Sequence, residues 1–329
     1  MLLTNFSLVT IMRHLISLIE TGVRNLPLSR APDELYEPVR YTLSLKGKRF
    51  RPLLLMMMNR LAGGKDDDAI HAALGIELLH TFTLMHDDIM DRAELRRGQP
   101  SVWSKYGSDT AILAGDLTFV MACREVTKVD ANVLAKTLHF FHEAARELCE
   151  GQQMDLLFEG KDVSLDEYLE MVSFKTGSLL GAASAIGCLI GSGDETQAAD
   201  AREFGVMLGT AFQIQDDILD TYGEQAKTGK AIGGDIAQNK KTYLLARASQ
   251  SLTEEQKGQL VELRQSEKRE YAVKQIRDLL DQTGIRAEAE MSRNRFFRSA
   301  MEILSSIPGD EQVREEIKQY CAELLERDH

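Results

Sequence analysis

Two copies of one acidic pattern lie far apart in the sequence, and their residue types are those that bind divalent metal ions. Residues 87–91 read D-D-I-M-D, and residues 216–220 read D-D-I-L-D. In a helix, the first and last aspartates of each copy lie on one face, about one turn from each other. Each copy therefore offers a pair of carboxylates at the end of an apolar stretch.

These carboxylates need a positive partner. Each copy closes a long apolar pattern and so lies at a predicted helix C-terminus, where the helix dipole disfavours negative charge. Two carboxylates about 4 Å apart also repel each other by about 4 kcal/mol at an effective dielectric constant of about 20. Oxygen ligands of this kind suit Mg²⁺, which binds one or two carboxylates together with water and substrate phosphates. One copy alone would more often be a solvated helix end, whereas two copies favour a metal–phosphate site.

A metal–phosphate site also needs cationic side chains that bind the same phosphates. Candidates follow each turn that could reach such a site: Lys48, Arg49 and Arg51 after Gly47, Arg96 and Arg97 after the first motif, Lys175 before Thr176, and Lys230 and Lys240 after the second motif. Taken singly, each is typical of a surface charge. Lys175 is the least typical, because it interrupts an otherwise apolar helical pattern.

The elements that must position these residues are predicted to be helices. Only 6 prolines are present, and no long stretch alternates polar and apolar residues as a strand would. Helical patterns cover residues 69–91, 109–128, 131–158, 165–190 and 195–222, a loop covers 223–238, and residues 241–329 are helical and highly charged. The pattern over 69–91 is apolar on all sides, which is typical of a buried central helix. No composition break marks a linker, so a single all-α domain over residues 1–329 is predicted.

Composition excludes several classes of protein. The 329 residues contain 39 Lys and Arg against 51 Asp and Glu, and the net charge of −12 argues against nucleic-acid binding. The four cysteines lie far apart, which favours buried thiols over a zinc site or disulfides. The apolar residues 179–190 are too few to span a bilayer, which takes roughly 20 residues, and no signal peptide is recognisable. We therefore expect a cytoplasmic protein without stable membrane insertion.

Taken together, these motifs resemble those of the trans-isoprenyl diphosphate synthases, the polyprenyl synthetase family. The matching strings run in the family's order from about residue 40 to 245: G-K-R-F-R-P at 47–52, His80 with H-D-D-I-M-D at 86–91, L-R-R-G at 95–98, K-T-G at 175–177, F-Q-I-Q-D-D-I-L-D at 212–220, and G-K at 229–230 with G-D at 234–235. Lys46 departs from the pattern, because the family usually has a second glycine there.

The resemblance implies a helical bundle around a central cavity, normally a homodimer, and a Mg²⁺-dependent prenyl transfer. An allylic diphosphate loses pyrophosphate, isopentenyl diphosphate captures the carbocation through its double bond, and a proton leaves. By this resemblance Asp87, Asp91 and Asp216 bind Mg²⁺ and act with Lys175 in catalysis, while Asp88, Asp217 and Asp220 act through water or through other side chains. The allylic diphosphate is expected to bind Arg96, Lys175, Thr176, Gln213 and Lys230, and isopentenyl diphosphate to bind Lys48, Arg51, His80 and Arg97.

Product length is expected to depend on bulky residues just before the first motif. Phe82 lies five residues before Asp87, and Thr83 lies four before it. Long-chain relatives commonly have a small residue at the position of Phe82, so the resemblance implies a short all-trans product, geranylgeranyl diphosphate first and farnesyl diphosphate second. At about 100° per residue, Thr83 lies more nearly beneath Asp87 than Phe82 does.

Three other interpretations stay open. A generic acidic helical scaffold leaves the repeated aspartate motif unexplained. A terpene cyclase shares the fold and the first aspartate motif, but it has a different second metal motif. A non-catalytic regulatory subunit of a heteromeric synthase tends to lose aspartate or arginine positions, and this chain keeps them.

Overall fold

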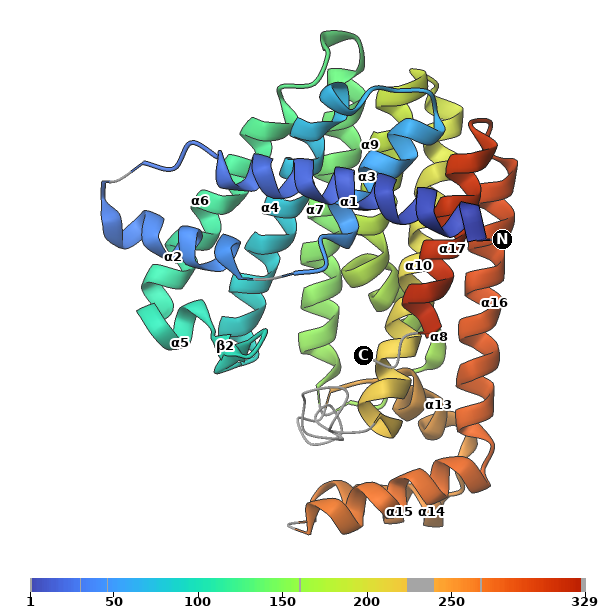
Figure 1. Cartoon of the computed structure of the whole chain (residues 1–329). Helices are drawn as coiled ribbons and strands as arrows, with labels where there is room; N and C mark the ends of the chain where they lie inside the picture. Colours follow the sequence, from blue (N-terminus) through green and yellow to red (C-terminus); the bar gives the residue numbers. More distant parts are fainter. Residues whose placement is uncertain are drawn as a thin grey trace. The chain divides into compact units, whose positions relative to one another are not determined.

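A computed structural model describes residues 2–29, 31–45, 47–159, 161–223, 240–266 and 268–326. Over these residues the chain is almost entirely helical, and the described strands are the two-residue β1 (Leu95–Arg96) and β2 (Gln99–Pro100), which pair antiparallel. Figure 1 shows this arrangement of long helices and one small hairpin. The predicted all-α fold is confirmed.

The chain divides into two compact units. Unit 1 comprises Met1–Ala145, Ala182–Arg202 and Ile307–Ile317, and unit 2 comprises Arg146–Gly181, Glu203–Ser306 and Lys318–His329. Four helices carry residues of both units: α7 (Ala131–Phe158), α9 (Ser178–Ser192), α10 (Glu195–Tyr222) and α17 (Glu311–Glu326). The single domain and the central cavity stay predictions.

Unit 1 is organised around α4 (Asp66–Met90), which packs most extensively against α6 (Ser108–Val126) and then against α3 (Phe50–Leu61). The other elements wholly within this unit, apart from the hairpin, are α1 (Leu2–Arg24), α2 (Asp33–Ser44) and α5 (Val102–Tyr106). Buried residues cover α4 from Ala69 to Leu79 on nearly all sides. The predicted burial of this helix is therefore confirmed.

The helix α4 begins at Asp66, earlier than the predicted start at residue 69. The residues Asp66, Asp67 and Asp68 form its first turn, where their charges complement the helix dipole. Both carboxylate oxygens of Asp66 accept hydrogen bonds of 2.7 Å from Arg60. The acidic run is thus part of the helix itself.

Unit 2 has its own apolar core. Among the residues that the structure describes, the elements wholly within this unit are α8 (Leu165–Val172), the π-helical turn η1 (Ser173–Gly177), α13 (Tyr243–Ser251), α14 (Glu254–Arg264), α15 (Arg269–Gln282) and α16 (Ile285–Ser306). The core joins apolar side chains of α8, α10, α13, α15 and α16. Most of the predicted loop over 223–238 lies outside the described residues.

One helical run is long and apolar enough to cross a membrane by length and composition alone. It covers Leu165–Ser192, and 72% of its most apolar window is buried inside the protein. A buried core helix passes the same test, so this run is weak support for a membrane span. The Gly-, Ala- and Ser-rich part within α9 is fully buried, as its small residues lead one to expect.

Candidate functional site

The first aspartate motif closes α4. The Asp91 N–H donates to the Asp87 carbonyl over 2.8 Å, which puts the two residues one helical turn apart. The helix ends because Arg92 adopts a left-handed conformation (φ 50°), and the Ala93 N–H then donates to the Asp88 carbonyl over 2.9 Å. Asp87 and Asp91 are partly exposed at this end, so their carboxylates are accessible to a ligand.

Asp88, the second residue of this motif, is only 2% exposed. Its carboxylate accepts hydrogen bonds from the Arg96 guanidinium through both Nε, at 3.0 Å from Oδ1, and Nη2. A charged partner of this kind compensates a buried carboxylate. Asp88 therefore holds in place one of the arginines that sequence reasoning assigned to the substrate.

Basic groups converge on the turn before α3. The Arg97 guanidinium donates to the Leu45 carbonyl over 3.2 Å, and a Cβ on Gly47 would lie only 2.7 Å from it, so a side chain at residue 47 would displace the guanidinium. The Arg51 Nη1 lies 3.3 Å from His80 Nε2. The pKa of His80 is held well below its ordinary value of 6.5, first by burial and then by the charges of Arg51, Arg97, Arg96 and Arg49. A neutral imidazole among arginines leaves this region strongly attractive to an anion.

Sequence reasoning missed the role of Arg49, a buried residue that ties the turn before α3 to its neighbours through hydrogen bonds. It is 5% exposed and takes a left-handed conformation (φ 49°). Its guanidinium donates to Glu20 over 2.7 Å, to buried Glu77, and to the Leu43 carbonyl over 3.0 Å. Strained backbone of this kind is maintained only where the surroundings fix it. No local signal could have found the network, because Glu77 lies 28 residues away.

The residues expected to limit product length lie on α4 before the motif. The ring of Phe82 packs edge-on against His86, with centroids 4.7 Å apart, and against Phe119 at 5.3 Å. Phe119 in turn stacks near Phe141 at 6.5 Å. The Thr83 hydroxyl donates to the His80 carbonyl over 2.8 Å, which directs it along its own helix. Phe82 thus belongs to an aromatic cluster, and it is only partly buried.

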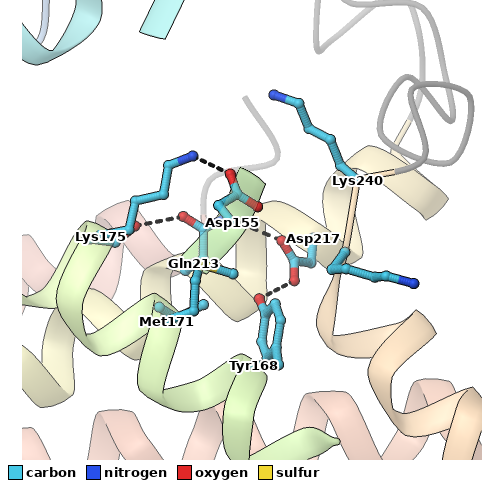
Figure 2. A pocket seen from close by; sticks show the side chains of 10 residues that line it. Asp155, Tyr168, Met171, Lys175, Gln213, Asp217 and Lys240 are labelled. Atoms are coloured by element: carbon cyan, nitrogen blue, oxygen red, sulfur yellow. Dashed lines mark hydrogen bonds and ion pairs between the residues drawn. The ribbon is translucent and has the colours of Figure 1, made fainter. Parts of the chain in front are cut away.

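The second aspartate motif lies near the end of α10. Asp216 is exposed, and Asp217 is 2% exposed. The Asp217 carboxylate accepts hydrogen bonds from the Tyr168 hydroxyl and from Gln213 Nε2 over 3.1 Å (Figure 2). It also accepts one from the Tyr243 N–H over 2.6 Å. In both motifs, therefore, the first aspartate is accessible and the second is buried and holds other side chains.

The π-helical turn η1 carries two of the predicted substrate-binding residues, Lys175 and Thr176, and both line the same pocket as Asp217. Extra-wide turns of this kind are frequent at functional sites. Lys175 forms an ion pair with Asp155, and the Thr176 hydroxyl donates to Gln213 Oε1 over 2.9 Å. The turn approaches α7 closely at Gly151, because a Cβ there would lie only 2.5 Å from the backbone nitrogen of Lys175. Asp155 was missed by sequence reasoning, although a glycine within a helical pattern was a signal of close packing.

These side chains surround a pocket of about 120 Å³ in unit 2. Figure 2 shows Lys240 and Lys175 on its rim and Asp217 and Tyr168 deeper in it. The lining residues are Asp155, Tyr168, Met171, Val172, Lys175, Thr176, Gln213, Asp217, Lys240 and Lys241. Cations at the rim and a hydrogen-bonded floor suit a ligand that carries an anionic group.

The predicted site residues fall into two groups. Unit 1 contains Lys48, Arg51, His80, Phe82, Thr83, Asp87, Asp91, Arg96 and Arg97, and unit 2 contains Lys175, Thr176, Gln213 and Asp216. Lys230 lies outside the described residues. That the two motifs face each other stays a prediction.

The carboxylates fit the requirements of Mg²⁺. Over the part of the chain that the structure describes, no group of three or more His, Cys, Asp or Glu side chains forms a closed metal cage. Each motif instead presents accessible carboxylates on one helical turn. Mg²⁺ is typically bound in this open way, with waters and substrate phosphates completing its octahedron.

Comparisons with known proteins agree with these features. The polyprenyl synthetase family model matches residues 32–282. A short chain isoprenyl diphosphate synthase of Methanocaldococcus jannaschii is 40% identical over 232 residues, which are 70% of this chain and 71% of that protein. A geranylfarnesyl diphosphate synthase of Natronomonas pharaonis is 40% identical over 249 residues, 70% of this chain and 72% of that protein.

The fold gives the same result. A crystal structure of geranylgeranyl pyrophosphate synthetase from Pyrococcus horikoshii Ot3 superposes with a TM-score of 0.92 at 34% identity, covering 98% of this chain and 99% of that one. The family match extends over well more than half of the sequence and includes both aspartate motifs. The chain therefore belongs to the polyprenyl synthetase family, and it is a prenyltransferase of the trans-isoprenyl diphosphate synthase type.

Proposed function

We propose that this enzyme condenses isopentenyl diphosphate with an allylic diphosphate, in the presence of Mg²⁺, to make a short all-trans prenyl diphosphate, geranylgeranyl diphosphate first. The observation that carries the proposal is the repeated arrangement of the two motifs. In each, an accessible first aspartate lies beside a buried second aspartate that holds a candidate substrate-binding side chain, Arg96 or Gln213. A duplicated acidic site flanked by cations matches the charge of a diphosphate bound with divalent ions.

The reaction needs charge stabilisation more than proton transfer. The C–O bond of the allylic diphosphate breaks with both electrons leaving on pyrophosphate, and a C–C bond then forms to the double bond of isopentenyl diphosphate. Loss of a proton gives a chain that is longer by one isoprene unit. Bound Mg²⁺ supplies positive charge to the leaving pyrophosphate.

The residues of the two units divide the work. Lys175, at the pocket of unit 2, binds the allylic diphosphate, and Thr176 and Gln213 line the same pocket and are joined by a hydrogen bond. Arg96 and Lys230 are assigned to the allylic diphosphate by the family resemblance. In unit 1, Lys48, Arg51, His80 and Arg97 bind isopentenyl diphosphate, because arginines and a neutral imidazole offer donors without needing a metal. Asp87, Asp91 and Asp216 are the metal ligands.

The aromatic cluster around Phe82, which joins side chains of α4, α6 and α7, supports the short product. In this proposal the bulk of Phe82 limits chain growth, and the ring of Phe119, with its centroid 5.3 Å away, packs against it. Replacement of Phe82 by Ala is expected to lengthen the product by at least one isoprene unit, whereas Leu84→Ala on the same helix serves as the control. Unchanged product length in Phe82→Ala would exclude this residue from length control.

The exposed apolar side chains of α6 support the proposed homodimer. Leu113 is 58% exposed and Val120 is 53% exposed, and their spacing of seven residues puts them on one helix face. Large apolar residues on one exposed face are typical of a protein interface. The substitutions Leu113→Glu and Val120→Glu are expected to shift the protein to monomer in light scattering after size-exclusion chromatography.

The activity is tested with labelled isopentenyl diphosphate and each allylic primer, with and without Mg²⁺, followed by chromatography of the dephosphorylated products. The expected result is elongation that depends on Mg²⁺ and stops at geranylgeranyl. A hydrocarbon product would instead support a cyclase, and elongation only after a second chain is added would support a regulatory subunit. We also propose a cytoplasmic location, consistent with four cysteines that form no disulfide.

A further inference from the structure

A chain of hydrogen bonds in unit 2 runs from the core to the pocket. It joins Tyr168 on α8 to Asp217, then Gln213 one turn earlier on α10, and then Thr176 on η1 (Figure 2). We call these four residues the relay. All four line the pocket.

The inner end of the relay is fixed by donors. Asp217 accepts from Tyr168 and also from the Tyr243 N–H at 2.6 Å, in the first turn of α13. A helix N-terminus favours a carboxylate there. Burial and the Asp217 charge raise the pKa of Tyr168 well above its ordinary value of 10.0, so the phenol keeps its proton and acts as donor. Asp217 therefore accepts hydrogen bonds from two donors at this end of the relay.

The polarity of the rest of the relay follows from that carboxylate. A carboxylate has no proton to donate, so Gln213 must face it with its NH₂ group, as the 3.1 Å bond from Nε2 shows. The amide oxygen then faces Thr176, whose hydroxyl must donate to it, as it does over 2.9 Å. Since a hydroxyl has one proton, Thr176 has only lone pairs left to offer a ligand.

We propose that Tyr168 and Asp217 are positioning residues that set this polarity, so that Thr176 presents an acceptor to the pocket and does not donate to the diphosphate. The inference rests on the proposed function and refines it, because it leaves the anionic contacts of this pocket to Lys175 and Lys240, which line the same cavity. It also gives a structural reason, the three hydrogen bonds of Asp217, for the expectation that this residue acts through other side chains whereas Asp216 binds metal.

The first test uses Tyr168→Phe, which removes one donor and keeps the ring in the core. Asp217 retains Gln213 and Tyr243 as partners, so the fold is expected to persist. The KM for the allylic diphosphate is expected to rise roughly tenfold, because loss of one donor to Asp217 loosens the relay and with it the η1 turn that carries Lys175. The KM for isopentenyl diphosphate should stay within about twofold, because its proposed ligands lie in unit 1. Equal changes in both constants, or no change in either, would overturn the positioning role.

The second test is a double-mutant cycle of Asp217→Asn and Thr176→Val, read out as the affinity for inorganic pyrophosphate with Mg²⁺ by calorimetry. In the parent protein, Thr176→Val should change this affinity less than about threefold, because the hydroxyl proton points away from the ligand. Asp217→Asn allows the Gln213 amide to turn over, which frees the Thr176 proton to point outward. In that background Thr176→Val should weaken binding roughly tenfold. An equal effect in both backgrounds would overturn the proposal.

The third test compares Asp217→Asn with Asp216→Asn in the same calorimetric experiment. If Asp217 is not a metal ligand, its variant should need the same Mg²⁺ concentration for half-maximal pyrophosphate binding, whereas Asp216→Asn should need roughly tenfold more. Similar shifts in the two variants would overturn the distinction. Circular dichroism of each variant checks that the helices are retained, and Tyr168→Phe decides the question if Asp217→Asn fails to fold.

Pyrophosphate binding needs no turnover, so the two proposals fail in different ways. A parent protein that binds magnesium pyrophosphate but elongates no primer would overturn the proposed reaction and leave the relay to be judged by the cycle. A parent protein that does not bind magnesium pyrophosphate at all would overturn the proposal that the relay shapes a diphosphate-binding pocket.

Discussion

The two aspartate motifs have nearly the same sequence, yet their buried residues are compensated in different ways. Asp88 is balanced by the charge of Arg96, which follows it by eight residues. The Asp217 carboxylate accepts hydrogen bonds from neutral donors of three separate elements: α8, α10 and α13. Both are 2% exposed. The same motif can therefore be anchored by a local ion pair or by a distributed hydrogen-bond network.

The helix ends around the two motifs differ as well. The end of α4 closes on itself through the left-handed Arg92. The end of α10 is closed from outside, because Arg277 on α15 donates to the Thr221 carbonyl over 2.6 Å and to the Gly223 carbonyl over 3.3 Å. The first motif is thus locally determined, whereas the second depends on elements much later in the chain.

The largest expected effect is a loss of kcat when an accessible aspartate is replaced. The comparison predicts that the loss is equal in the two motifs. Asp87→Asn and Asp216→Asn should each lower kcat on the order of 1,000-fold, because each removes charge that binds the metal. Stability should change by less than about 0.5 kcal/mol, since neither side chain is buried. Asp67→Asn, at an exposed position of the first turn of α4, is the control and should keep full activity. Full turnover in either site variant would contradict the assignment.

The buried aspartates should separate the two regions. Asp88→Asn leaves the Arg96 guanidinium without its counter-charge and should cost about 3 kcal/mol in the free energy of unfolding. Asp217→Asn keeps an acceptor for Tyr168 and Tyr243 and should cost about 1.5 kcal/mol. Urea denaturation of the two variants measures both values. The reverse order would mean that the network is worth more than the ion pair.

The pH dependence of stability should have opposite signs in the two regions. The pKa of His80 is depressed in the folded state, so below pH 6.5 the unfolded chain binds a proton that the folded chain does not, and stability falls as pH falls. The pKa of Tyr168 is raised, so its contribution is present below pH 10 and is lost as pH rises above that value.

Each slope should reach at most about 1.4 kcal/mol per pH unit. Unfolding free energies measured across the pH range check this, with His80→Asn expected to flatten only the acid side and Tyr168→Phe only the alkaline side. A flattening on the wrong side would show that other groups dominate.

The smallest effects are expected at the helix ends, and they too should have opposite signs. Arg92→Gly removes a side chain from a left-handed position and should stabilise the protein by about 1 kcal/mol. Arg277→Ala removes the donors at the end of α10 and should destabilise it by about 1 kcal/mol. Thermal unfolding measures both, and a destabilised Arg92→Gly would indicate that the arginine makes a contact worth more than the strain.

Much of the fold was predictable because the relevant patterns are local. Apolar residues on all sides of 69–91 predicted a buried helix, and the structure has one. The end of the predicted helix 195–222 agrees with α10, since its apolar pattern and Gly223 are both visible in the sequence. The helix predicted from residue 69 in fact begins at Asp66. The difference arose because caps and first turns use the same acidic residues.

The candidate site was predictable by residue type and only partly by role. Spacing identified the two pairs of carboxylates and Lys175. Spacing could not identify Asp155 as the partner of Lys175, because the two lie 20 residues apart in the sequence. It could not identify Tyr168 as the partner of Asp217 either, because these two lie 49 residues apart. Arg49 and Glu77 were hidden for the same reason.

The sequence by itself determined the class of the protein and the chemistry of its motifs, because helical periodicity and ligand spacing act within one or two turns. Only the tertiary structure decided that the second aspartate of each motif is buried and which side chains hold it, because burial depends on neighbours that are distant along the chain. The direction in which Thr176 donates its proton belongs to that second kind of information, since it follows from a carboxylate and a phenol on two other helices.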